Sequence, residues 1–285
     1  MWTQKDETDF FLSSIKKNID IKNLFYKIED NYFAYIPKEN KNNIATLQSR
    51  NAIIGSWTEK WCKNLLDEVA KQNNLYAVNG VICDELGINK QSSADLAFCT
   101  TDKIEQDADN IKVIFEIKMS IVNNYKYELI DNKPIISYCG DYKSHKGMPS
   151  LRRSDSVLKA IGKAINIRVS SEKANKIPII ILGNTNISEN YLNKIDHLGK
   201  YGIIQKMISL NPNISENNCS DDKFFITPNN ETELFSIINN ILKMDLHYFS
   251  TMIDMEQLGK IIKDSAVYDN NEEIVQYFLN TIQGN

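Results

Sequence analysis

Apolar residues recur along the chain at two different spacings, and this difference separates predicted helices from predicted strands. The clearest helical pattern covers residues 52–72. Its apolar residues lie three and four positions apart and form one stripe: Ile54, Trp57, Trp61 and Leu65. A second helix is predicted over residues 155–169, and weaker helical patterns occupy residues 8–19 and the tail from residue 231 onward.

Strands are predicted where apolar residues alternate with polar ones or follow one another directly. An aromatic, extended stretch and a later hairpin are expected at 25–36 and 125–138. Three further segments show enough alternation to be strands: 75–83, 93–100 and 111–119. Residues 177–182 form an almost continuous apolar run, which is typical of a central strand covered on both faces. With a fifth strand over 202–210, the order predicts an α/β fold in which helices flank a mixed sheet of four or five strands.

Length and composition are those of a soluble globular protein. The chain has 285 residues, of which 42% are hydrophobic and 25% charged. We divide it into an N-terminal helical or extended region (1–51), a core (52–210) and a mostly helical C-terminal region (211–285). No apolar stretch reaches the roughly 18 residues of a membrane span, the N-terminus lacks the pattern of a secretion signal, and the five cysteines are widely spaced. These features predict a cytoplasmic protein with reduced thiols.

Charge is distributed unevenly along the sequence. The net charge of −4 argues weakly against a protein that coats nucleic acid. Residues 141–168, however, contain only two acids, Asp141 and Asp155, and seven basic residues. The basic residues are Lys143, Lys146, Arg152, Arg153, Lys159, Lys163 and Arg168. A basic strip on an otherwise acidic body can bind a polyanion locally.

Three charged residues interrupt two of the predicted strands. Asp95 lies in the strand over 93–100, and Glu116 and Lys118 lie in the next strand. Glu116 and Lys118 are two positions apart and project from the same face, whereas Ile117 points into the core. Charges within apolar strands are costly without a partner or a function. Two carboxylates and a lysine at one sheet edge can hold Mg²⁺ and activate water against a phosphodiester.

This arrangement resembles the PD-(D/E)XK nuclease superfamily, most of all its type II restriction endonucleases. The order of helix, three-strand meander, helix and strand over residues 52–183 is similar to the core of that superfamily. The resemblance implies that Asp95 and Glu116 bind Mg²⁺ together with the carbonyl of Ile117, and that Lys118 acts on the attacking water. Ala94 replaces the proline that names the motif, a replacement that is frequent in the superfamily.

The resemblance also implies an acid in the early helix, within a Gly-x-x-x-Glu pattern. Residues 55–59 fit this pattern, so Glu59 is a secondary catalytic candidate. The alternative is that Glu59 is only a solvated helix residue beside Lys60 and Lys63.

In restriction endonucleases, the region after the catalytic strand often helps to grip DNA. The resemblance therefore implies that seven side chains here bind DNA: Lys143, His145, Lys146, Arg152, Arg153, Lys159 and Lys163. The helix over 155–169 has Ser154 as its expected N-cap and Val157, Ile161 and Ile165 as its apolar stripe. Lysines on its other face would meet phosphates, and the loop arginines would reach guanine edges. Alternatively, these lysines form a solvated face paired with Asp155.

The sequence therefore predicts a type II restriction endonuclease. It would hydrolyse double-stranded DNA at a specific sequence with Mg²⁺, act as a homodimer on a palindromic site, and use residues 211–285 for dimerisation or sequence reading. Two alternatives stay open: a repair or junction-resolving nuclease of the same fold, and a non-catalytic DNA-binding protein whose acids form a structural ion-pair cluster. Scattered histidines and the absence of a CxxC pair, a phosphate loop or a Gly-x-Ser-x-Gly elbow disfavour other enzyme classes.

Overall fold

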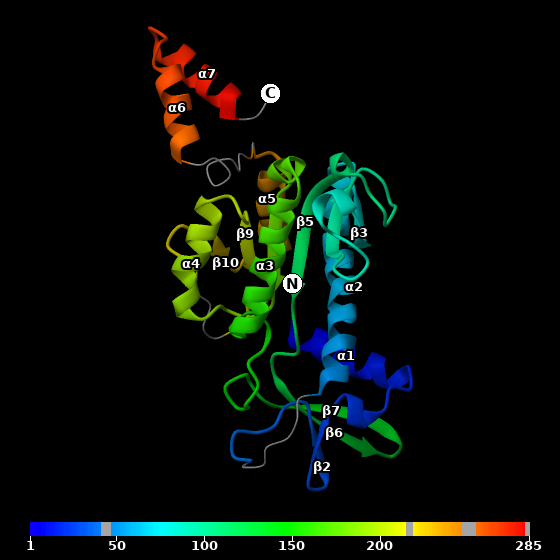
Figure 1. Ribbon diagram of the computed structural model, residues 1–285. Helices are drawn as coiled ribbons and strands as arrows, with labels where there is room; N and C mark the ends of the chain where they lie inside the picture. The colour runs from blue at the N-terminus through cyan, green and yellow to red at the C-terminus, as the bar shows by residue number, and fades with distance from the viewer. Residues whose placement is uncertain (41–46, 215–218, 245, 247–254, 283–285) are drawn as a thin grey trace.

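The computed structural model describes residues 1–40, 47–214, 219–244, 246 and 255–282. Within these ranges the chain forms two sheets flanked by helices (Figure 1), which confirms the predicted α/β class. The larger sheet has six strands in the order β10-β9-β8-β5-β4-β3. The prediction of four or five strands was wrong for two reasons. The two-residue strand β10 is too short to leave an alternation, and four other extended segments build a separate sheet.

The larger sheet combines an antiparallel half with a parallel half. Its strands, in chain order, are β3 (Tyr76–Val81), β4 (Ala94–Cys99), β5 (Ile111–Lys118), β8 (Ile179–Gly183), β9 (Lys206–Ser209) and β10 (Phe225–Ile226). The first three form an antiparallel meander, and β5 then pairs in parallel with β8, at the junction between the two halves. Strands β8, β9 and β10 continue in parallel.

The smaller sheet is entirely antiparallel. Its strands, in spatial order, are β1 (Tyr26–Ile28), β2 (Asn31–Phe33), β6 (Asn124–Ile130) and β7 (Lys133–Gly140). The extended N-terminal segment and the hairpin expected from the sequence therefore pair with each other. Asp131 and Asn132 both have positive φ, which is the backbone that a tight two-residue hairpin requires.

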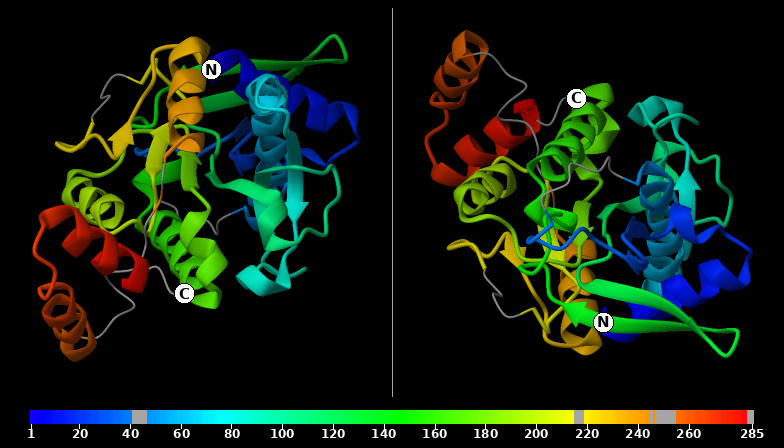
Figure 2. Two further views of the ribbon diagram at one scale, coloured as in Figure 1. Left: turned by 90° about the horizontal axis from the view of Figure 1, so that it is seen from above. Right: turned by 90° about the horizontal axis from the view of Figure 1, so that it is seen from below.

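Helices cover both faces of the larger sheet (Figure 2). One face packs against α1 (Gln4–Lys16), α2 (Gln48–Gln72) and α5 (Glu231–Leu242). The opposite face packs against α3 (Ser154–Ser170) and α4 (Glu189–Lys200). The last two helices, α6 (Met255–Ser265) and α7 (Asn271–Ile282), pack against each other near the C-terminus (Figure 1), so the tail is helical as predicted.

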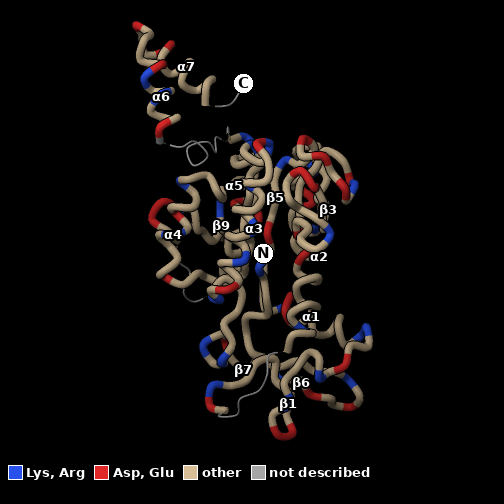
Figure 3. Tube along the Cα trace, viewed as in Figure 1, with Lys and Arg blue, Asp and Glu red and all other residues tan. Residues whose placement is uncertain are grey.

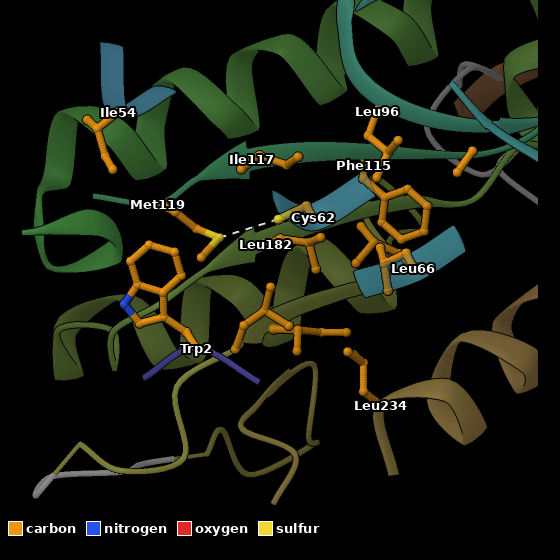
Figure 4. Close-up of a cluster of buried hydrophobic side chains, with 14 of the residues drawn as sticks. Trp2, Ile54, Cys62, Leu66, Leu96, Phe115, Ile117, Met119, Leu182 and Leu234 are labelled. Carbon is orange, nitrogen blue, oxygen red and sulfur yellow. Dashed lines mark hydrogen bonds between the residues drawn. The ribbon is translucent and has the colours of Figure 1, made fainter. Parts of the chain in front are cut away.

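The core between α2 and the sheet determines which way the β5 side chains point (Figure 4). Phe115 and Ile117 are buried there with Leu66 of α2 and Leu182 of β8. Because side chains alternate along a strand, the intervening Glu116 projects from the opposite face, toward α3. The apolar stripe predicted for α2 lies in this core, so the packing of α2 was predicted correctly.

The stripe predicted for helix α3 is partly correct, because Val157 is buried and Ile161 packs against the same core. The buried apolar residues of α3 are Val157, Ala160, Ala164 and Ile167. Ile165, expected to be in the core, is 40% exposed. The buried face therefore includes the two small alanines, and the bulkier Ile165 lies outside it. The predicted N-cap was also one residue late, because Arg153 holds that position and Ser154 is already helical.

Residues outside 52–210 belong to the same core as the sheet. Trp2 and Phe10 of the N-terminal region and Leu234 and Ile238 of α5 lie in one buried cluster with Phe115. One buried cluster therefore contains residues from all three of the regions defined from the sequence. None of the helices in the described ranges combines the length and the apolar character needed to cross a bilayer.

A buried carboxylate fastens α1 to the connection between the two sheets. Glu7 is fully buried and accepts five hydrogen bonds. The donors are the Trp2 indole (3.2 Å), the Val122 amide (2.6 Å), the Asn123 amide (3.2 Å) and side chain (2.9 Å), and the Tyr125 hydroxyl (2.7 Å). Since residues 122–125 lead from β5 into β6, Glu7 fixes how the smaller sheet follows the larger one.

Candidate active site

The acids and the lysine predicted from the two strands meet on the α3 face of the sheet. Antiparallel pairing of Leu96 with Phe115 brings Asp95 next to Glu116 on the adjoining strand. The Lys118 ammonium donates to Glu116 Oε1 and lies 3.5 Å from Asp95 Oδ2. The backbone amide of Ile117 donates to the same Asp95 oxygen at 2.7 Å. The side chains of Asp95, Glu116 and Lys118 thus lie together on one face of the sheet, as the strand periodicity predicts.

A second lysine completes the cluster from α3. The Lys163 ammonium lies 3.2 Å from Asp95 Oδ1 and 2.5 Å from Glu116 Oε2, and it donates to the Ser93 carbonyl at 2.6 Å. We expected Lys163 on a face open to phosphates, but its side chain is only 15% exposed and is directed at the acids. Two carboxylates and two ammonium groups therefore form a set with no formal net charge.

The protonation of this cluster follows from burial and from its mixed charges. Burial raises the pKa of Glu116, and so does the negative charge of Asp95, whereas the two lysines act in the opposite direction. Burial acts to lower the pKa of Lys118, but the charges of Asp95 and Glu116 outweigh it and raise this pKa. In this arrangement Lys118 is an ammonium ion, which can orient a water or stabilise a phosphate but cannot accept a proton.

The oxygen atoms of the cluster suit a hard cation such as Mg²⁺. Glu116 Oε2 is buried and makes no hydrogen bond, since its close contact with Lys163 lies outside hydrogen-bonding geometry. The Ile117 carbonyl accepts from Lys118 at 3.2 Å and so faces the same space. Among the described residues no three His, Cys, Asp or Glu side chains converge on a metal position. The cluster thus supplies two carboxylates and one carbonyl, and water would complete the coordination.

The cluster lies in an open, polar pocket of about 500 Å³. Its lining combines β4, β5 and α3 with the loop before β4: Gln91, Ser92, Ser93, Asp95, Glu116, Lys118, Lys159, Lys163 and Asn166. Sequence reasoning missed the three loop residues and Asn166. Asn166 could have been found, because it follows Lys163 by three positions and therefore shares its helix face.

Glu59 does not line this pocket. It is half-buried on α2, the helix that packs on the opposite face of the sheet. Burial raises the pKa of Glu59, and the nearby charge of Asp95 adds to the effect. Asn79 links the two positions, because its side chain donates to the Glu59 carbonyl at 3.0 Å and to the Asp95 carbonyl at 2.9 Å. Glu59 is thus electrostatically coupled to the cluster without joining it.

His145 is not placed to contact DNA, contrary to expectation. Its ring is 2% exposed and stacks on Tyr35, with centroids 3.9 Å apart. Its Nε2 lies 3.0 Å from the Val122 carbonyl. The surrounding loop folds inward because the Lys146 amide donates to the Ile36 carbonyl. Burial lowers the pKa of His145, which favours the neutral ring.

The two arginines that follow this loop make local contacts. Arg152 donates to Asn186 at 3.1 Å and lies 4.7 Å from the centre of the Tyr142 ring. Arg153 is exposed and forms two hydrogen bonds with Asp155, at 2.8 and 3.0 Å. Neither arginine lines the pocket.

The basic strip counted from the sequence overstates the positive charge at the surface. Arg168 is completely buried and donates to backbone carbonyls, including that of Ile177 at 2.8 Å. Lys143, Lys146 and Lys159 are exposed, and only Lys159 of these three borders the pocket. Figure 3 accordingly shows acidic and basic residues interspersed along the trace rather than one continuous basic band.

A polar junction holds the backbone immediately after Lys118. The Ser150 hydroxyl donates to the Lys118 carbonyl at 2.6 Å and accepts from the Asn184 amide at 3.0 Å. The Ser150 amide donates to the Ser120 hydroxyl at 2.8 Å. Ser150 has a φ of 48°, a left-handed backbone that is uncommon for residues other than glycine. Nothing in the sequence marked Ser150, because its bonds depend on loops that meet only in the fold.

Two substitutions at Ser150 separate its hydrogen bonds from its backbone strain. Both Ser150→Ala and Ser150→Gly remove the hydroxyl from the Lys118 carbonyl and the Asn184 amide, which we expect to destabilise the fold by about 1–3 kcal/mol. Glycine relieves the left-handed strain, so Ser150→Gly is expected to be the more stable by about 1 kcal/mol. Urea unfolding measures both values. Equal stability of the two variants would contradict the strain argument.

Comparisons with protein-family models, with curated proteins and with solved structures gave no match to this chain.

Proposed function

We propose that this protein is a Mg²⁺-dependent DNA endonuclease. The observation that carries the proposal is the convergence of Asp95, Glu116 and Lys118 in an open polar pocket, where Glu116 is buried and the Ile117 carbonyl faces the same cluster. An enclosed pocket would suit a small metabolite, whereas an open one lets an extended strand pass. The order of α2, β3–β5, α3 and β8 adds support through its likeness to the nuclease core that the sequence resembles.

The roles of the side chains follow from their positions. Asp95, Glu116 and the Ile117 carbonyl would hold the ion, which supplies charge stabilisation at the phosphate and a more acidic bound water. The Ile117 amide orients Asp95 through its 2.7 Å bond. The Lys118 ammonium would leave the carboxylates and offset charge on the scissile phosphate. Lys159, exposed at the pocket border, would contact the backbone of the bound strand.

The finer proposal is a type II restriction endonuclease that acts as a homodimer. Its support is the resemblance of the strand motif, together with exposed lysines in the loop after β7 and on α3. The charge-neutral ion-pair set favours one second candidate, a non-catalytic DNA-binding protein in which the four charges only stabilise the sheet.

The experiment that tests the proposal uses purified protein and unmethylated phage DNA, with Mg²⁺ or with a chelator. Discrete fragments that require Mg²⁺ are the expected result for a restriction endonuclease. A smear or nicking, or preference for a four-way junction added as a second substrate, would indicate a less specific or junction-resolving nuclease. Salt-sensitive DNA binding without cleavage would contradict the proposal and favour the non-catalytic candidate.

A further inference from the structure

The acid pair has two cation positions, and each holds a lysine ammonium. On one side, Lys118 lies among Glu116 Oε1, the Ile117 carbonyl at 3.2 Å and Asp95 Oδ2 at 3.5 Å. On the other side, Lys163 lies among Glu116 Oε2 at 2.5 Å, the Ser93 carbonyl at 2.6 Å and Asp95 Oδ1 at 3.2 Å. Each carboxylate therefore gives one oxygen to each ammonium, and a backbone carbonyl completes each position.

The two lysines differ in how they are held. Lys118 ends β5 and has the greater exposed fraction, 21% against 15% for Lys163. Lys163 projects from the middle of α3, one residue before Ala164, which packs against the sheet. If Lys163 moved away, the Ser93 carbonyl would lose its hydrogen-bond donor, and both carboxylates would lose the ammonium that α3 supplies as their ion-pair partner. Lys118 is therefore the ammonium that can give up its position.

We propose that Lys163 is a built-in cation that permanently fills the second position, so that the acid pair binds one divalent ion and not two. The inference rests on the proposed metal-dependent function. A divalent ion on the Lys118 side would keep both carboxylates and the Ile117 carbonyl. A second divalent ion would have to displace Lys163 or lie against its positive charge, which is strongly unfavourable at a few ångströms in a partly buried site.

The test counts Mn²⁺ ions bound per chain in DNA-free protein, with free Mn²⁺ followed by electron paramagnetic resonance. The variants are Lys163→Met and Lys163→Gln, which remove the charge, and Lys163→Arg, which keeps it. Lys159→Met is the matched control, because it removes a lysine from the same helix and pocket but leaves the acid pair intact. Thermal unfolding confirms that each variant is folded. Binding that disappears in Glu116→Gln is assigned to the acid pair.

The wild type, Lys163→Arg and Lys159→Met are expected to bind one ion at the pair. Lys163→Met and Lys163→Gln are expected to bind a second ion, or to bind the first about tenfold more tightly or better. Unchanged stoichiometry and affinity in both neutral variants would overturn the inference alone. Loss of Mn²⁺ from folded neutral variants would also overturn it, since Lys163 would then only hold the acids in place. A wild type that binds no Mn²⁺ at the pair would overturn the inference and the proposed function together.

Discussion

Lys118→Met and Asp95→Asn are each expected to lower the rate of Mg²⁺-dependent DNA cleavage by about a hundredfold to a thousandfold. Lys118→Met removes the ammonium that would offset charge on the scissile phosphate. Asp95→Asn removes the carboxylate charge while keeping one oxygen that can accept from the Ile117 amide. Single-turnover cleavage of a DNA fragment that contains the target site measures both effects on the chemical step.

A lysine on the same strand provides the control for this prediction. Lys112 is exposed near the start of β5, where it donates to the Asp109 carbonyl at 2.8 Å. Lys112→Met removes the same charge from the same strand, outside the pocket, and is expected to cleave at close to the wild-type rate. If Lys112→Met and Lys118→Met lost activity equally, the cause would be the change in the net charge of the protein and not the loss of the Lys118 ammonium from the cluster.

The largest stability effect is expected from Glu7→Ala. This change leaves five donor groups on four buried or half-buried residues without their acceptor: the Trp2 indole, the Val122 amide, the Asn123 amide and side chain, and the Tyr125 hydroxyl. Leaving this many buried donors without an acceptor is expected to lower the free energy of unfolding by about 3–5 kcal/mol. Denaturant unfolding measures the loss. Asp9→Ala, an exposed change on the same helix, is expected to cost less than about 1 kcal/mol.

The loss in Glu7→Ala should depend on pH in a definite direction. Burial raises the pKa of Glu7 in the folded protein, although its hydrogen bonds oppose this effect. A carboxyl group whose pKa is higher in the folded than in the unfolded protein adds to the free energy of unfolding at a pH below its unfolded-state pKa. This added stability is lost as the pH rises through the folded-state pKa. The destabilisation caused by Glu7→Ala is therefore expected to be larger in acid than at neutral pH. A loss that grows as the pH rises would contradict this assignment.

The cluster at the sheet was predictable because strand periodicity is local. Spacing alone placed Glu116 and Lys118 on one face, and the meander brought Asp95 beside them. The same argument was only partly correct for α3, because Val157 and Ile161 pack in the core but the buried face also takes in Ala160 and Ala164 and leaves out Ile165. Lys163 directly precedes the buried Ala164, and it contacts the two acids instead of lying on the DNA-facing surface predicted for it.

Residues whose roles depend on distant contacts could not be identified from the sequence. Ser150 acts through Lys118 and Asn184, each more than 30 positions away. His145 was predicted to bind DNA, yet its ring stacks on Tyr35, from the segment after β2. The smaller sheet was missed for the same reason, because β2 and β6 are far apart in the chain.

In the proposed function, the Glu116 carboxylate holds the ion that drives hydrolysis. Glu116→Gln tests this role most directly, because the amide keeps the size of the side chain and removes its charge. Wild type and variant would be compared on the same phage DNA in Mg²⁺, with thermal unfolding in parallel. We expect the variant to stay folded and its cleavage rate to fall by about a thousandfold or more. A folded Glu116→Gln protein that cleaves at the wild-type rate would contradict this role.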